Sequence, residues 1–303
     1  MLNVGSRVCI VFGTGCNMNC RYCYRDNGKI ATPKNITEHF KDFLRQLTPE
    51  KTKAVVASGG EPLLYIDKIK EAFVCVNQKI HKKLMTNGLL LTQEIIDYVN
   101  DNDIELFLSH DGEITEYSRG VDVLKDKKLL DLVRQVKHLV VYNVITALNC
   151  DLIKNYEYIA GKLGHRNFHM RHGVVFPNGH NEYLEEGFDY DAYIKSYLEF
   201  CRRGLNIVPY YTYNPNSRPY GINYLLDGTV VAMEDMYVYG NIDMTEEKLK
   251  ILYKEHYKEK LADCDKNCFL SKNCVLNLST KGKAICRCFK MREDMALGGK
   301  YVL

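Results

Sequence analysis

Short strand-like runs alternate with amphipathic helical patterns through the first two thirds of this 303-residue chain. The runs are apolar enough for buried strands, and apolar residues recurring every three or four positions mark the helical patterns. The strand-like runs are residues 7–12, 53–58, 82–86, 104–109, 138–146 and 168–175, and helical patterns include residues 92–99, 152–163 and 190–203. Six such units predict an α/β fold with a parallel sheet or barrel.

The alternation stops after about residue 204. Residues 209–220 carry three prolines among polar residues, which is typical of a linker. Residues 224–232 predict two short strands around an Asp227-Gly228 turn. The remaining tail is cysteine-rich with weak periodicity, so we expect a metal to order it. The sequence therefore predicts two domains, residues 1–204 and residues 205–303.

Charge and hydropathy exclude several classes of protein. The chain has 41 Lys and Arg against 38 Asp and Glu, a net charge of +3, so it lacks the strongly basic balance of a DNA-binding domain. It contains no stretch of about 18 apolar residues, which a membrane-spanning helix would need. Its N-terminus shows no charged segment leading into an apolar run. We expect a cytoplasmic protein without a DNA or membrane partner.

Three of the twelve cysteines, Cys16, Cys20 and Cys23, form a compact group directly after the first strand. Cytosolic thiols stay reduced, so such a group indicates a metal site or catalysis before disulfides. A structural zinc site needs four ligands, and this loop offers three with no histidine nearby. Three thiolates can instead bind three irons of a four-iron cluster and leave the fourth iron open. A zinc loop with a distant fourth ligand is the alternative.

The pattern Cys16-x-x-x-Cys20-x-x-Cys23, with Tyr22 inside it, resembles the signature of the radical S-adenosylmethionine (radical SAM) superfamily. Further family marks follow in order at residues 58–62 (Ser-Gly-Gly-Glu-Pro), 109–112 (Ser-His-Asp-Gly) and 143–146 (Asn-Val-Ile-Thr). The resemblance spans about residues 5 to 175 and implies a partial (β/α)6 barrel of the TIM type. It assigns cofactor binding to Tyr22, Gly59, Gly60, Glu61, Ser109, Asp111, Asn143, Val144 and Arg171.

Within that assignment, the Gly-Gly-Glu segment would hold the methionine amino group of SAM, the segment at residue 109 its ribose, and the segment at residue 143 its adenine. Each mark also has a structural alternative. Gly59 and Gly60 can be a simple turn, Glu61 a solvated loop charge, and Ser109 or Asp111 a helix cap. All of them end strands, and barrel enzymes keep their chemistry at that face.

The resemblance also implies the chemistry. The open iron of a reduced [4Fe-4S] cluster binds SAM, and an electron from a flavodoxin or ferredoxin cleaves it to methionine and a 5′-deoxyadenosyl radical. That radical takes hydrogen from a substrate carbon. The protein supplies positioning and excludes water, while the cofactor carries the difficult step.

Five further cysteines crowd the tail: Cys264, Cys268, Cys274, Cys286 and Cys288. With the preceding segments 227–232 and 240–242, they resemble the SPASM/twitch extension of radical SAM enzymes, which carries auxiliary clusters. Three positions where that extension has a cysteine lack one here, for example Met233 and Leu278. The resemblance thus implies one auxiliary [4Fe-4S] cluster on Cys264, Cys268, Cys274 and either Cys286 or Cys288. Structural zinc is the alternative.

One thiol of Cys286 and Cys288 is then left over, as an idle cysteine or as a catalytic hydrogen donor to a substrate radical. Enzymes with such extensions largely modify peptides or proteins, so we expect a ribosomally made peptide or a protein as substrate. Tyrosines in residues 210–220 either contact a peptide or pack a linker, and Arg171 and His172 either enter the active site or lie on the surface. A sugar or small metabolite as substrate, and a cysteine-rich regulator without enzymatic activity, are the alternatives.

Overall fold

Six parallel strands form the centre of the fold in the computed structural model, which describes residues 7–23, 31–174, 187–205, 222–232 and 236–256. They are β1 (Arg7–Val11), β2 (Ala54–Ser58), β3 (His81–Thr86), β4 (Glu105–Ser109), β5 (Leu139–Ile145) and β6 (His169–Val174). These strands lie side by side in chain order, each parallel to the next. The predicted mixed α/β fold with a parallel sheet is confirmed, and each strand ends within about two residues of its predicted bounds.

Three more strands extend the sheet beyond β1: β7 (Ile222–Tyr224), β8 (Thr229–Ala232) and β9 (Val238–Asn241). β7 pairs in parallel with β1, and β8 pairs antiparallel with β7 on one side and with β9 on the other. The Asp227-Gly228 hairpin is confirmed. Gly228 has a φ of +86°, and the Asp227 carboxylate accepts from the Thr229 N–H at 2.9 Å. Residues on both sides of position 204 therefore share one sheet, and the proposed domain boundary stays a prediction.

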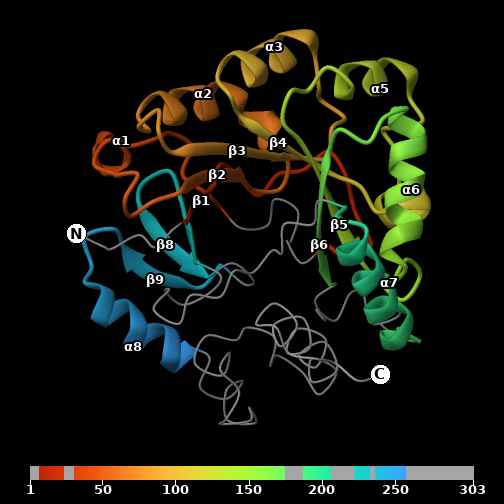
Figure 1. The fold of residues 1–303 in the computed structure, drawn as a ribbon. Coiled ribbons are helices and arrows are strands. Elements are labelled where there is room, and N and C mark those ends of the chain that lie inside the picture. The colour runs from red at the N-terminus through yellow and green to blue at the C-terminus, as the bar shows by residue number, and fades with distance from the viewer. Residues whose placement is uncertain (1–6, 24–30, 175–186, 206–221, 233–235, 257–303) are drawn as a thin grey trace.

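Helices cover the outer face of the parallel strands (Figure 1). They are α1 (Glu38–Arg45), α2 (Ile66–Val74), α3 (Gln93–Asp101), α4 (Thr115–Arg119), α5 (Lys127–Val133), α6 (Leu152–Leu163) and α7 (Tyr190–Arg202), and α8 (Glu246–His256) follows β9. Side chains accept backbone N–H groups at several helix starts, including Thr37, Thr92, Asp126 and Asp151. Such caps satisfy backbone donors that a helix start leaves open, so they fix where each helix begins.

Alternate residues of the strands point to opposite faces of the sheet. Leu84, Leu106 and Val141 face the helices and belong to the main hydrophobic core. On the opposite face Lys83, Phe107 and Arg171 meet: the Lys83 Nζ and the Arg171 Cζ lie 5.4 and 5.1 Å from the Phe107 ring centroid. This face, which we call the inner face of the sheet, thus carries charged side chains, whereas the face that packs on the helices is apolar.

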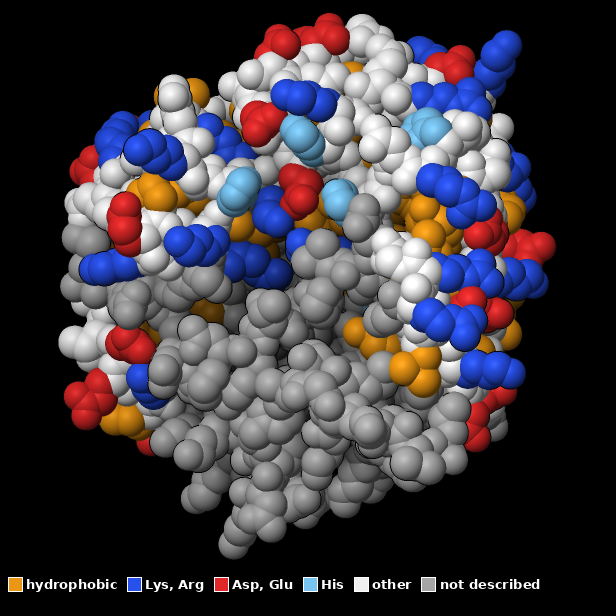
Figure 2. Space-filling model, in the orientation of Figure 1, with side chains coloured by type: hydrophobic (Ala, Val, Ile, Leu, Met, Phe, Trp, Pro, Cys, Tyr) orange, Lys and Arg blue, Asp and Glu red, His pale blue; other side chains and the backbone are white. Residues whose placement is uncertain are grey.

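On the face shown in Figure 2, basic and acidic side chains are intermixed over the described residues. Exposed ion pairs of the molecule include Arg166 with Glu157 and Lys125 with Glu116. Among the residues that the structure describes, no helix is long and apolar enough to cross a membrane.

Candidate active site

The cysteine loop follows β1 at the carboxyl end of the parallel strands. Cys16, Cys20 and Cys23 form no disulfide in the described part of the chain; the first two are half-buried and the third is exposed. The Cys16 sulfur accepts from the Met18 N–H at 3.4 Å and from the Asn87 amide at 3.9 Å. Burial raises the pKa of Cys16, and it raises the pKa of Cys20 to about 11 although the Arg119 cation opposes it.

The two glycines after β2 let this loop lie directly against the end of the sheet. Gly60 N–H donates to the Gly13 carbonyl at 2.9 Å, and Glu61 N–H donates to the Gly15 carbonyl at 2.8 Å. A Cβ on Gly60 would lie 2.2 Å from the Gly15 oxygen, and one on Gly59 would lie 2.4 Å from the Gly13 oxygen. Only glycine permits this approach. The pair is therefore more than a simple turn, because it also lets the cysteine loop approach the end of β2.

Glu61 is buried, with 1% of its surface exposed, so the alternative of a solvated loop charge is wrong. Its carboxylate accepts from the Leu63 N–H at 3.0 Å, the Thr86 hydroxyl at 2.8 Å and the Asn87 N–H at 2.8 Å. Burial raises the pKa of Glu61, and these three hydrogen bonds oppose that rise. Its side chain joins the ends of β2 and β3, and contact with a cofactor would fall to the backbone.

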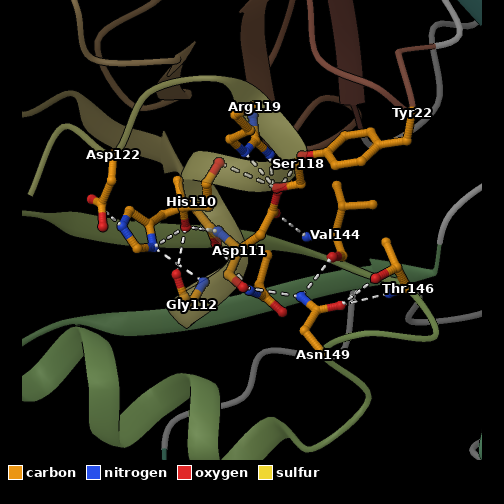
Figure 3. A network of polar contacts seen from close by, with 12 residues as sticks. Tyr22, His110, Asp111, Gly112, Ser118, Arg119, Asp122, Val144, Thr146 and Asn149 are labelled. Carbon is orange, nitrogen blue, oxygen red and sulfur yellow. Dashed lines mark hydrogen bonds and ion pairs between the residues drawn. The ribbon is translucent and has the colours of Figure 1, made fainter. Parts of the chain in front are cut away.

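Asp111 is the centre of a buried network at the end of β4 (Figure 3). Its carboxylate accepts from the Tyr22 hydroxyl at 2.5 Å, the Ser118 hydroxyl at 2.7 Å and the Val144 N–H at 2.9 Å. Arg119 adds two bonds, Nε at 2.8 Å and a terminal nitrogen at 3.2 Å. Asp111 precedes the short 3-10 helix Gly112–Ile114 but makes no capping bond to it, so the cap alternative is wrong for this side chain.

His110 supports the same turn. Its Nδ1 lies 3.2 Å from the Gly112 N–H, which can only donate, so Nδ1 accepts and carries no hydrogen. The Nε2–H then donates to Asp122 at 2.9 Å. Burial alone would raise the pKa of Asp122, but hydrogen bonds from His110, Tyr158 and the Leu124 N–H lower it. His110 therefore has a structural role, because it joins the Gly112 turn to Asp122.

The backbone of β5 beside this network is fixed on both sides. The Val144 N–H donates to Asp111, and the Val144 carbonyl accepts from the Asn149 amide at 3.0 Å. The Asn143 amide nitrogen donates to the His110 carbonyl at 2.9 Å, and its oxygen accepts from Asn155 at 3.2 Å. The Asn143 side chain and the Val144 backbone are thus hydrogen-bonded within the protein, and the half-buried Val144 side chain packs on Tyr22.

The remaining predicted residues lie outside the hydrogen-bond networks of Glu61 and Asp111. Ser109 is half-buried at the end of β4, and Arg171 lies against Phe107 on the inner face of β6. His172 points the other way, with its Nε2 2.9 Å from the Tyr193 hydroxyl of α7, so it does not enter the active site. The tail cysteines, Met233, Leu278 and residues 210–220 lie outside the described residues. Sequence reasoning missed Arg119, Ser118, Asn149 and Asn87, which no motif marks.

The donor set of the loop fits a cluster, because three soft thiols stand on one short segment. Within the described ranges, no three His, Cys, Asp or Glu side chains form a group that could hold a single metal ion. In a four-iron cluster each thiolate binds a different iron.

Residues 10–149 match the family model described as the Radical SAM superfamily. This chain carries a radical SAM domain. The radical SAM cyclopropyl synthase TigE of Paramaledivibacter caminithermalis is 22% identical over 161 residues, which cover 45% of this chain and 34% of that protein. The 7-carboxy-7-deazaguanine synthase of Methanothermobacter thermautotrophicus is 30% identical over 152 residues, 46% of this chain and 58% of that one. The chain thus spans between about a third and three fifths of the length of these two relatives.

Solved structures show a similar fold over most of this chain. Native anSMEcpe with bound AdoMet aligns with a TM-score of 0.64 at 21% identity, covering 88% of this chain and 87% of that one. Streptococcus suis SuiB bound to precursor peptide SuiA aligns with a TM-score of 0.62 at 15% identity, covering 90% and 72%. At these identities the likeness shows the fold alone. Together with the domain match, it confirms the predicted partial-barrel architecture.

Proposed function

We propose that the protein is a radical SAM enzyme whose cluster is bound by Cys16, Cys20 and Cys23. The observation that carries this proposal is the three-thiol loop lying against Gly59 and Gly60, inside the matched domain. When bound, the [4Fe-4S] cluster and SAM supply reductive cleavage of SAM to methionine and a 5′-deoxyadenosyl radical, which takes hydrogen from the substrate.

The residues of the chain have distinct positioning roles in this proposal. The Gly59-Gly60-Glu61 backbone binds the methionine end of SAM, and the Glu61 carboxylate keeps that backbone in place through Thr86 and Asn87. Ser109, at the end of β4, contacts the ribose, and the segment from Asn143 to Val144 contacts the adenine. Tyr22 and Val144 pack together beside Cys20 and exclude water from this end. Arg171, on the inner face of β6, contacts the bound cofactor or substrate.

We propose a ribosomally made peptide or a protein as the substrate. Structures of similar fold include anSMEcpe with a bound peptide and SuiB with its precursor peptide, which support this class. The alternative substrate is a small metabolite or carbohydrate. It is favoured by the similarity to the 7-carboxy-7-deazaguanine synthase and to the probable GTP 3′,8-cyclase of Methanococcus aeolicus, at 30% and 31% identity. Both classes need an external one-electron reductant, for which we propose a flavodoxin or ferredoxin.

We further propose one auxiliary [4Fe-4S] cluster on Cys264, Cys268, Cys274 and either Cys286 or Cys288. The spare thiol of that last pair is then available as a hydrogen donor to a substrate radical. In an extended segment the two side chains point the same way, so both can approach one site.

The test of the activity is the formation of 5′-deoxyadenosine after anaerobic iron–sulfur reconstitution, reduction with dithionite and addition of SAM. We expect the wild-type protein to form it and the Cys16→Ala/Cys20→Ala/Cys23→Ala variant to form none, because three cluster ligands are lost. Cys75→Ala, a half-buried thiol at the end of α2, is the matched control and should retain full turnover.

Full turnover by the triple variant would contradict the assignment, and no turnover by the wild-type protein would favour a metal-binding regulator. The substrate class is tested by co-expression with neighbouring small reading frames followed by mass spectrometry. A mass change in such a peptide that depends on Cys16, Cys20 and Cys23 is expected. A peptide left unchanged while SAM cleavage responds to an added small metabolite would favour the alternative.

A further inference from the structure

The cysteine loop is attached to α4, a five-residue helix that no cofactor-binding motif includes. The Arg21 N–H donates to the Ser118 carbonyl at 2.8 Å, and the Arg21 guanidinium lies 4.3 Å from the Tyr117 ring centroid. Tyr22 reaches Asp111 from the same loop. The loop that carries the three thiols is therefore positioned by contacts of Arg21 and Tyr22.

At the centre of this contact lies a buried ion pair. Asp111 is fully buried and Arg119 is 7% exposed, and two bonds join them. Figure 3 shows both side chains converging beside Tyr22. The Arg119 Cζ lies 5.3 Å from the Tyr22 ring centroid, and Tyr22 in turn packs against Cys20. Tyr22 thus contacts both members of this ion pair and also a thiol that the cluster needs.

Buried charges act over such distances with little screening, because the local dielectric is far below that of water. Reduction adds a negative charge to a cluster held by thiolates. A neighbouring cation stabilises the reduced form and raises the reduction potential, and a neighbouring anion does the opposite. Net charge around a cluster is one of the main determinants of its potential. Residues beyond the ligands commonly adjust a metal site in this way.

We propose that Arg119 and Asp111 are positioning residues that also set the reduction potential of the cluster at Cys16, Cys20 and Cys23, with opposite signs. The proposal rests on the proposed function, since it requires that cluster. Tyr22, Ser118 and the Val144 N–H still donate to the Asp111 carboxylate when the Arg119 cation is removed. Each charge can therefore be removed separately.

The experiment is an anaerobic redox titration of the reconstituted full-length protein. The titration is monitored by electron paramagnetic resonance, using the cluster signal that changes when SAM is added. Arg119→Gln keeps a donor for Asp111 but removes the cation, so we expect a lower potential than in the wild-type protein. Asp111→Asn keeps the shape but removes the anion, so we expect a higher potential. The variant Asp111→Asn/Arg119→Gln should lie between the two single variants.

Two control variants distinguish the effect of a lost charge from the effect of a disturbed structure. Ser118→Ala removes one neutral hydrogen bond to Asp111, and Arg119→Lys retains the positive charge, so both should stay close to the wild-type potential. Iron content and thermal melting identify any variant that fails to fold. In that case the comparison of Arg119→Lys with Arg119→Gln still decides the sign.

Shifts of the same sign in Arg119→Gln and Asp111→Asn would overturn the proposal, and so would a shift in Ser118→Ala as large as theirs. A wild-type protein without any signal that responds to SAM would overturn the proposed function, and this inference with it. A normal wild-type signal with unshifted variants overturns the inference alone.

Discussion

Glu61 shows at the scale of one residue what the sequence can and cannot reveal. Its place in the Ser58–Pro62 segment marks it as a site residue, and the structure puts it at the end of β2 as expected. Its three donors, Leu63, Thr86 and Asn87, include two from the end of β3, about 25 positions away in the chain. No local pattern reports such partners, so whether its carboxylate serves the cofactor or the fold follows only from the structure.

We predict that Glu61→Gln destabilises the protein even without SAM. In either orientation the amide places its N–H₂ group against a backbone N–H, that of Leu63 or of Asn87, which can only donate. At least one buried group then loses its partner, at a cost of about 1–3 kcal/mol. Thermal unfolding of the apo-protein measures this as a lowered Tm. The control is Glu94→Gln, whose exposed ion pair with Lys70 contributes little. Equal melting of the two variants would show that the Glu61 network does not stabilise the fold.

At the scale of the elements, segments with a clear apolar period or turn motif were predictable, and segments without either were not. β5 and α6 bury a regular set of apolar side chains, and their positions agree with the prediction. The short α4 has no such period, yet Ser118 and Arg119 lie on it. Gly59 and Gly60 could be recognised from their motif, but not the oxygens of Gly13 and Gly15 against which they pack. A contact between two loops cannot be predicted from the residue pattern of either loop.

We predict that Gly60→Ala displaces the cysteine loop. The added Cβ would lie 2.2 Å from the Gly15 oxygen and 2.4 Å from the Thr14 oxygen, so backbone has to move. We expect reduced iron incorporation and weaker SAM binding, measured by iron analysis and by calorimetric titration of the reconstituted protein. Gly161→Ala is the matched control. Nothing lies within 4 Å of its Cβ position on α6, and the exchange should leave both properties unchanged. Normal iron and SAM binding in Gly60→Ala would show that the approach of the loop to β2 is not required.

At the scale of the whole molecule, the sheet connects parts of the chain that composition separates. The loss of alternation after residue 204 predicted a boundary, but β7 joins β1 through the Ile10–Tyr224 pair, and the Thr37 N–H donates to the Leu226 carbonyl at 3.0 Å. A three-residue strand is too short for its sequence pattern to predict the strand with which it pairs. The cysteine-rich tail that follows α8 is where the sequence predicts the second metal centre, and its ligands are counted best in the intact chain.

We predict about eight irons per wild-type chain after anaerobic reconstitution, because two four-iron clusters each take up four. The Cys16→Ala/Cys20→Ala/Cys23→Ala variant should keep about four, since the tail cysteines bind their cluster independently of that loop. A matching Cys264→Ala/Cys268→Ala/Cys274→Ala variant should also keep about four, but with the signal that responds to SAM intact. Iron and zinc are measured together by mass spectrometry of the metals. About twelve irons would mean that a second auxiliary cluster exists despite Met233 and Leu278. About four irons and one zinc per wild-type chain would assign the tail to structural zinc, provided that the tail variant loses the zinc and keeps the iron.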